Sequence, residues 1–148
     1  MNDKGTTSAT PPPDAADPIF FTFLQVGHTL MARLESALQG VGLSPAKFEV
    51  LDQLVRAGEP VPLRVLAEGQ RCVPSNMTQL IDRLEADGLV RRVDDPSDRR
   101  IVRAGLTALG IERARTGADV VVQVQEEFAA SLAPADRAVL GRVLAAFR

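Results

Sequence analysis

The residues best suited to specific chemistry lie in one polar stretch, residues 93–107, with the sequence VDDPSDRRIVRAGLT. Asp98 precedes Arg100 by two residues, so its carboxylate can hold the guanidinium group in one orientation before any partner binds. An arginine fixed in advance avoids part of the rotamer entropy lost on binding, which reaches about 2 kcal/mol. Exposed arginines such as Arg99 and Arg100 suit the narrow minor groove of DNA, where negative potential is concentrated.

The aspartates of the same stretch require an explanation, because carboxylates repel phosphate. Asp95-Pro96-Ser97-Asp98 fits a type I turn, with a hydrogen-bond acceptor first, proline second and a small polar residue third. Asp95 therefore has a structural role, whereas Asp94 has none that we identify. Taken alone, the stretch fits a solvated turn without a partner as well as it fits a DNA contact.

A second group of candidate residues lies in residues 74–86, PSNMTQLIDRLEA. At about 100° per residue, the apolar side chains gather on one side of a helix and the polar ones on the other. The N-terminal half of the polar side can donate and accept hydrogen bonds, as contact with base edges in the major groove requires. The residues expected to face the groove are Ser75, Asn76, Thr78 and Gln79.

Two observations weigh against this interpretation of the helix. In isolation, the segment is more simply an amphipathic helix with a solvated polar face. Asp82 also lies on the polar side, where it would repel phosphate unless it pairs with Arg83 or another nearby arginine. The neighbouring elements favour the DNA-reading interpretation.

Those elements are predicted from hydrophobic periodicity, capping residues and turn residues. They are two helices, two short helices, two strands and two further helices, at about 18–42, 44–58, 62–69, 74–86, 89–93, 101–106, 107–131 and 134–147. A helix-turn-helix followed by a β-hairpin is a winged helix. The expected fold class is therefore mainly α with a small β-hairpin wing, flanked by N- and C-terminal helices.

The domain organisation follows from the same pattern. Residues 1–17 contain three consecutive prolines and are expected to form a disordered tail. Residues 18–148 form one domain, with a winged helix-turn-helix core at about 44–106. The flanking helices, about 18–42 and 107–147, have apolar stripes too wide for this core to cover, so we expect them to hold a homodimer together. The positions expected to be buried in the helices after residue 43 are Phe48, Leu51, Leu54, Val55, Val120, Val121, Val124, Phe128, Val139, Leu140, Val143 and Leu144.

Composition limits the classes of function. The 148-residue chain has a net charge of −2, which argues against a nucleic-acid partner unless its cations cluster. A single cysteine and the lack of a long apolar run or leader pattern fit a cytoplasmic protein without a membrane partner. One histidine and one cysteine leave no catalytic triad or Cys/His zinc site. We therefore expect no enzyme activity, no cofactor and no metal.

From about Leu43 to Ala114, the chain resembles the MarR family of bacterial transcription regulators. The segment IDRLEADGLVRR is typical of the family, and the most specific match is the set Asp98, Arg100, Leu106, Thr107 and Gly110. The resemblance implies a homodimer on a pseudo-palindromic operator in double-stranded DNA, with recognition helices in major grooves and wings in flanking minor grooves. It usually implies a repressor that is released by a small phenolic or other anionic ligand, or by oxidation.

The resemblance also implies roles for individual residues. Arg100 becomes the minor-groove arginine, Asp98 its tether and Arg99 its neighbour at the wing tip. Arg83 becomes a base or phosphate contact and Arg64 a phosphate contact. The groove-facing positions are the Ser75, Asn76, Thr78 and Gln79 already named from the helical pattern.

The chain departs from the family pattern at several positions. Val73 stands where a serine usually caps the recognition helix, Ala133 replaces the usual cap of the last helix, and Ala104 replaces a β-branched residue. Cys72 matches a buried apolar position, so an inert core thiol is a simpler interpretation than a redox sensor. His28 lies near the family's ligand pocket, although a structural or surface role explains it more simply.

One alternative function remains beside the regulator. A winged-helix protein can lose DNA binding and act as a protein-interaction module, and the negative net charge is the best support for that interpretation.

Overall fold

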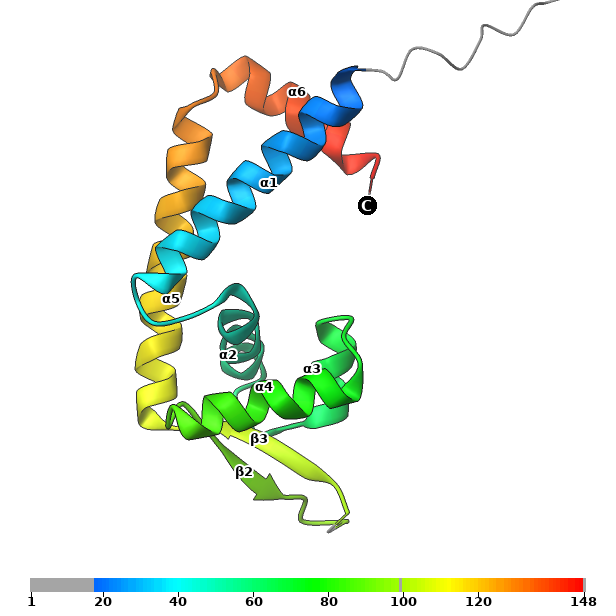
Figure 1. The fold of residues 1–148 in the computed structure, drawn as a ribbon, viewed down its shortest axis with the longest axis vertical. Coiled ribbons are helices and arrows are strands. Elements are labelled where there is room, and N and C mark those ends of the chain that lie inside the picture. The colour runs from blue at the N-terminus through cyan, green and yellow to red at the C-terminus, as the bar shows by residue number, and fades with distance from the viewer. Residues whose placement is uncertain (1–17, 99, 148) are drawn as a thin grey trace, which may run out of the picture. The chain divides into compact units, whose positions relative to one another are not determined.

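The computed structural model describes residues 18–98 and 100–147 (Figure 1). The chain divides into two compact units, with the boundary after Ala32. The expected tail at residues 1–17 and the candidate Arg99 lie outside the described residues. The elements are α1 (Pro18–Gln39), α2 (Pro45–Ala57), β1 (Val61–Pro62), α3 (Leu63–Gly69), α4 (Pro74–Ala86), β2 (Val90–Asp94), β3 (Val102–Leu106), α5 (Ala108–Ala130) and α6 (Pro134–Ala145). Their order confirms the predicted winged helix-turn-helix with helices on both sides.

The described part of the first unit is the N-terminal portion of α1. Phe20 and Phe21 contact each other edge to face, with ring centroids 5.5 Å apart, and both side chains are more than half exposed. The last turns of α1 belong to the second unit, where Leu38 is fully buried and Leu34 packs against the core.

Helix α2 is capped at both ends of the predicted range 44–58. The Ser44 side chain accepts a hydrogen bond from the Lys47 amide, and Gly58 ends the helix in the left-handed conformation at φ +68°. Leu51 and Leu54 are buried as expected, and Phe48 is partly buried. The predicted burial of Val55 is wrong, because its side chain is 47% exposed. It lies at the edge of the apolar stripe and lines an open surface pocket instead of the core.

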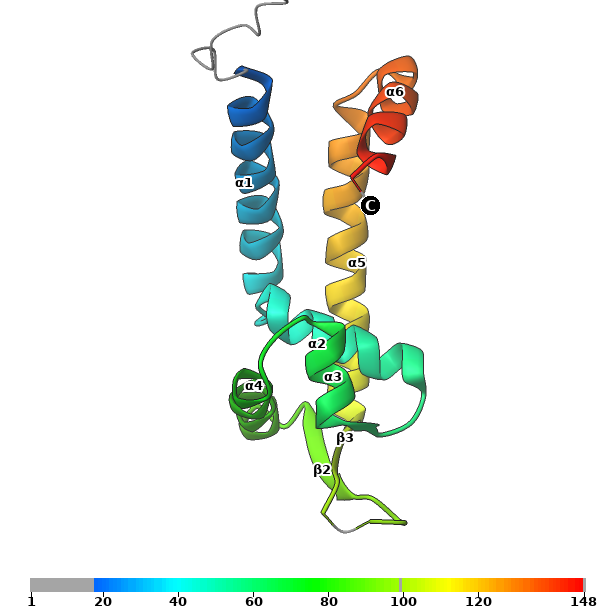
Figure 2. The same cartoon turned by 90° about the vertical axis from the view of Figure 1, so that its right-hand side faces the viewer.

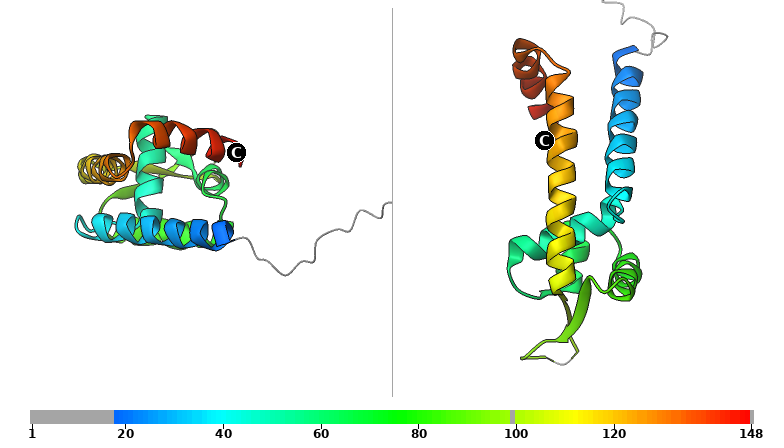
Figure 3. Two further views of the ribbon diagram at one scale, coloured as in Figure 1. Left: turned by 90° about the horizontal axis from the view of Figure 1, so that it is seen from above. Right: turned by 90° about the vertical axis from the view of Figure 1, so that its left-hand side faces the viewer.

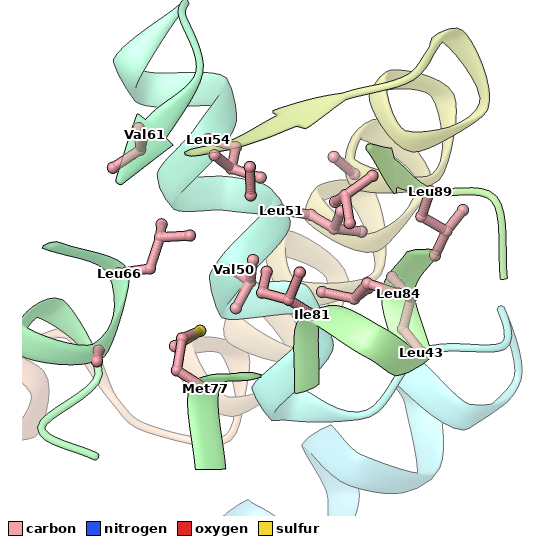
Figure 4. Packing of buried hydrophobic residues seen from close by; sticks show 14 of the residues in the cluster. Leu43, Val50, Leu51, Leu54, Val61, Leu66, Met77, Ile81, Leu84 and Leu89 are labelled. Carbon is pink, nitrogen blue, oxygen red and sulfur yellow. The ribbon is translucent and has the colours of Figure 1, made fainter. Parts of the chain in front are cut away.

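The core lies where α2, α3, α4 and the sheet meet (Figure 4). Helix α4 contributes Met77, Ile81 and Leu84, all with 0% exposure, and α3 contributes Leu66 and Ala67. The apolar side of α4 predicted from its periodicity is therefore the side that fixes this helix in the domain.

The sheet has three antiparallel strands in the order β1-β3-β2. Strands β2 and β3 form the predicted hairpin, with Arg92 directly opposite Ala104. Strand β1 was not predicted, since two residues ending in a proline carry no alternating pattern. Figure 2 shows the hairpin projecting beyond the helices of the second unit, near α4.

Helix α5 packs against α2 through small residues (Figure 3). A Cβ added at Gly117 would lie 2.6 Å from the Phe48 ring, so the two helices come too close for any side chain there. Val120 and Val121, predicted to be buried, are partly buried against the core. Val124 and Phe128 are also only partly buried.

Helix α6 differs most from the expectation. Its predicted core positions Val139, Val143 and Leu144 are 48%, 52% and 37% exposed, and Leu140 is only partly buried. Their burial within the single chain was wrongly predicted, because the described residues of this chain do not cover the apolar side of α6.

Candidate nucleic-acid interface

A tight turn joins α3 to α4. Arg71 adopts a positive φ of 51°, and the amide of Cys72 donates to the Ala67 carbonyl at 3.0 Å. The Gln70 side chain donates to the carbonyl of Ala46 at 3.3 Å, which ties this turn to α2. Cys72, expected at a buried apolar position of the turn, is partly buried and packs against the core. The turn therefore holds α4 in a fixed orientation on the domain.

The N-terminal half of α4 presents the predicted groove-facing residues to solvent. Ser75, Asn76, Thr78 and Gln79 are all exposed, as is Arg83 one turn later. The hydroxyl of Thr78 donates to the Pro74 carbonyl at 3.1 Å, which leaves its oxygen free to accept. The structure places these side chains together on one surface.

The start of α4 lacks a side-chain cap, as the sequence predicts. Val73 is extended, at φ −72° and ψ 148°, but has no side-chain oxygen to accept a hydrogen bond. Its backbone carbonyl accepts from the Asn76 amide at 3.0 Å, and Pro74 occupies the first turn. Pro74 has no N–H, and the Met77 amide also donates to the Val73 carbonyl, so the Ser75 amide is the one that stays open to an anion.

Asp82 pairs with an arginine from the hairpin and not with Arg83. Arg92 of β2 donates from Nη2 to Asp82 Oδ1 at 2.5 Å and from Nη1 to the Glu85 carboxylate. The backbone amide of Arg92 also donates to Glu85, at 3.1 Å. The hydrogen bond to Asp82 is the main cause of a raised Arg92 pKa, and Glu85 contributes to the rise. Sequence reasoning left this partner open, because the two positions are ten residues apart in different elements.

Asp95 organises the loop between β2 and β3. This carboxylate is almost fully buried and accepts hydrogen bonds from the Ser97 amide at 2.8 Å, the Ser97 hydroxyl at 2.6 Å and the Asp98 amide at 3.1 Å. Arg103 donates to it from Nε at 2.6 Å and to the Pro60 carbonyl from Nη1 at 3.1 Å. The Ser97 hydroxyl first, then the Ser97 amide and Arg103, hold the Asp95 pKa well below its ordinary value. The structural role predicted for Asp95 is confirmed.

Asp98 contacts Arg100 through two parallel hydrogen bonds. Arg100 donates from Nε to Oδ1 at 3.1 Å and from Nη2 to Oδ2 at 3.2 Å, and its amide donates to Oδ1 at 3.0 Å. These hydrogen bonds lower the Asp98 pKa. The Arg100 side chain is 90% exposed, so it is both oriented and accessible.

Two other candidates are less constrained. Arg64 on α3 is 79% exposed and pairs with Glu68 one turn away at 3.4 Å. His28 is exposed on the α1 portion of the first unit.

Across residues 18–98 and 100–147, no group of three His, Cys, Asp or Glu side chains could hold a metal ion. None of the helices within those ranges is long and apolar enough to cross a membrane.

This architecture is similar to that of known transcriptional regulators. The MarR family model matches residues 43–102. MhqR, an HTH-type transcriptional regulator of Bacillus subtilis, is 34% identical over 93 residues, or 63% of this chain and 63% of MhqR. The chain spans about half the length of the curated relatives it matches, from 46% to 63%. AbsC, a MarR family transcriptional regulator from Streptomyces coelicolor, is 33% identical with a TM-score of 0.78, covering 92% of this chain and 93% of AbsC.

The chain belongs to the MarR family. CouR from Rhodococcus jostii, solved bound to p-coumaroyl-CoA, is 27% identical with a TM-score of 0.72, covering 88% of this chain and 92% of CouR. Within this MarR-family fold, α4 occupies the position of the recognition helix and the β2–β3 hairpin that of the wing. The family and the fold class expected from the sequence are both confirmed.

Proposed function

We propose that this MarR-family chain is a sequence-specific DNA-binding transcriptional regulator. The observation that carries the proposal is the state of Arg100, which is 90% exposed at the wing tip yet held by two hydrogen bonds to Asp98. A solvated arginine without a partner gains little from such restraint. An arginine that enters a narrow minor groove gains affinity, because less rotamer freedom is lost on binding.

The recognition helix supplies the second part of the interface. Ser75, Asn76, Thr78 and Gln79 contact base edges in the major groove. The open amide of Ser75 at the start of α4 suits a backbone phosphate. Arg83 and Arg64 contact phosphates or, for Arg83, a base. Arg64 exchanges its exposed pair with Glu68 for a phosphate, which costs little because such surface pairs are weak.

A homodimer on a pseudo-palindromic operator is the form we propose for this regulator. Exposed valines and a leucine along α6, and exposed phenylalanines on α1, provide apolar area that a partner chain can cover. A two-fold symmetric dimer presents two recognition helices to two half-sites, so the operator mirrors the protein's symmetry. Such a protein acts in the cytoplasm, where the chromosome lies.

We propose further that the dimer represses transcription and is released by a small phenolic or other anionic ligand. Support for the ligand class comes from CouR, a relative at 27% identity that was solved with p-coumaroyl-CoA bound. Phenolic acids and their coenzyme A esters are the compounds to add to the protein–DNA complex. A ligand that binds the free dimer better than the DNA-bound dimer lowers the fraction of DNA bound.

Electrophoretic mobility shift on the protein's own promoter region, at two salt concentrations, tests the DNA-binding proposal. We expect selective binding at low salt that weakens as salt rises, because the protein displaces counterions. The Arg100→Ala variant should bind about 1–3 kcal/mol more weakly, with an unchanged sedimentation coefficient. A wild-type protein that shifts no promoter fragment selectively at low salt would be the protein-interaction module instead.

A further inference from the structure

The recognition helix and the wing are joined by a side-chain contact that the proposed DNA interface does not use. Arg92 of β2 reaches across to α4 and divides its guanidinium group between Asp82 and Glu85, two carboxylates three residues apart on one helix face. Its own amide donates to Glu85 at 3.1 Å. Three hydrogen bonds therefore link the base of the wing to the second half of the recognition helix.

The opposite face of the hairpin is fixed in a different way. Adjacent residues of a strand point to opposite sides, so Arg103, opposite Val93, lies on the other face from Arg92, opposite Ala104. Arg103 joins Asp95 to the Pro60 carbonyl, next to β1. The wing is thus attached to α4 on one face and to the segment before β1 on the other.

We propose that Arg92 is a positioning residue that sets the separation and angle between recognition helix and wing, so that both enter their grooves at once. This inference rests on the proposed DNA binding. The nitrogens Nη1 and Nη2 of Arg92 are both engaged on carboxylates, and its side chain is 31% exposed, against 90% for Arg100. Arg92 therefore acts through α4 and β2, while Arg100 touches DNA.

The backbone alone does not set this angle. The connection from α4 to β2 turns through Gly88 at φ +71°, a conformation that glycine adopts freely, and then enters β2 at Val90. The Lys47–Asp87 ion pair at 2.5 Å fixes the end of α4 to α2, but it does not reach the hairpin. Beyond the turn, Val90 of β2 and Leu84 of α4 share the core, and the Arg92 contact adds the hydrogen bonds that link β2 to α4.

A double-mutant cycle between Arg92→Gln and Arg100→Ala tests the inference. In the wild-type background, Arg100→Ala should weaken operator binding by about fivefold to 150-fold. In the Arg92→Gln background, the wing is no longer placed in its groove, so the same change should weaken binding by only about twofold. Arg91→Gln is the matched control, because it removes the same charge from the neighbouring strand position. In the Arg91→Gln background, the fold-loss of operator affinity caused by Arg100→Ala (the Arg100→Ala factor) should equal that in wild type.

Two further variants separate positioning from charge neutralisation. Arg92→Lys keeps the charge but cannot bridge two carboxylates with one planar group, so its cycle should resemble that of Arg92→Gln. Asp82→Ala/Glu85→Ala keeps the arginine and removes its acceptors, so the Arg100→Ala factor should again fall. If this double variant binds DNA more tightly and keeps the full Arg100→Ala factor, Arg92 only neutralises repulsive charge and the inference is wrong.

Circular dichroism on each variant establishes that it is folded at the temperature of the binding measurement. If Arg92→Gln does not fold, Arg92→Lys replaces it in the double-mutant cycle. A wild-type protein without selective DNA binding overturns the proposed function, and this inference with it. Selective wild-type binding, together with an Arg100→Ala factor that is equal in all backgrounds, overturns the inference alone.

Discussion

At the scale of single residues, the wing shows how three neighbouring aspartates serve different purposes. Asp95 accepts four hydrogen bonds and shapes the loop, whereas Asp98 orients Arg100. Asp94 is exposed at the end of β2, and nothing in the structure explains its charge. The turn sequence predicted the first two roles, because turn residues act on near neighbours in the chain. The Arg103–Asp95 and Arg92–Asp82 pairs join distant positions, so local spacing could not predict them.

Replacing Asp95 with Asn should destabilise the protein at neutral pH and hardly at all in strong acid. The Asp95 carboxylate has a lowered pKa in the folded state, so its stabilisation is complete above the ordinary aspartate value of 3.8 and is lost progressively as the pH falls from there through the lower pKa of the folded state. Thermal unfolding of both proteins from pH 7 to pH 2 checks this. The difference in unfolding temperature between the wild type and Asp95→Asn should narrow below about pH 4. Asp94→Asn is the matched control and should match wild type at pH 7.

At the scale of elements, capping residues set the boundaries that sequence reasoning located best. Ser44 and Gly58 bound α2, and Thr107 caps α5 by accepting the Gly110 amide. The burial of residues within the apolar helix faces was harder to predict. Hydrophobic periodicity identifies which face of a helix is apolar, but it does not show which part of the protein covers that face. Val55 and the valines of α6 therefore matched an apolar pattern but remain exposed in the single chain. Strand β1 is too short to carry any pattern.

The missing cap of α4 leads to a stability prediction. Val73→Ser should raise the free energy of unfolding by about 0.5–1 kcal/mol, because a serine oxygen can accept an open amide of the first turn. Val73 already has the extended conformation of a capping residue and is 56% exposed, so little apolar burial is lost. The unfolding temperature should rise by about 2–4 °C. Val73→Ala, which removes the same apolar bulk without adding an oxygen, should show no gain.

At the scale of the whole molecule, the order of elements along the chain was enough to predict the winged helix and its flanking helices. Dimerisation remains a prediction that rests on uncovered apolar surface. Val139 and Val143 lie one turn apart on α6 and are each about half exposed. In a single chain such a stripe gains nothing from its apolar character, whereas a second copy would bury it.

Adding charge to that stripe should therefore separate the chains. Val139→Glu/Val143→Glu should sediment as a monomer at concentrations where the wild type is a dimer, because two buried carboxylates would lack partners. Gly141 lies on the opposite side of α6, and a side chain there meets open space. Gly141→Glu should therefore remain dimeric. A wild-type monomer, or a dimer that tolerates both glutamates, would place the interface elsewhere.

The first turn of α5 leaves no free space against the segment that enters the wing. A Cβ at Gly110 would lie 1.9 Å from the carbonyl oxygen of Leu89, and the Thr107 hydroxyl donates to the Gly88 carbonyl at 2.7 Å. Helix α5 is also packed against α2 at Gly117, so it is held to the winged helix at two places along its length. Its far end at Ala130 lies about 30 Å from Gly110. If α5 and the winged helix turn as one body, a displacement of about 2.5 Å at Ala130 corresponds to a rotation of about 5° of α4 and the wing.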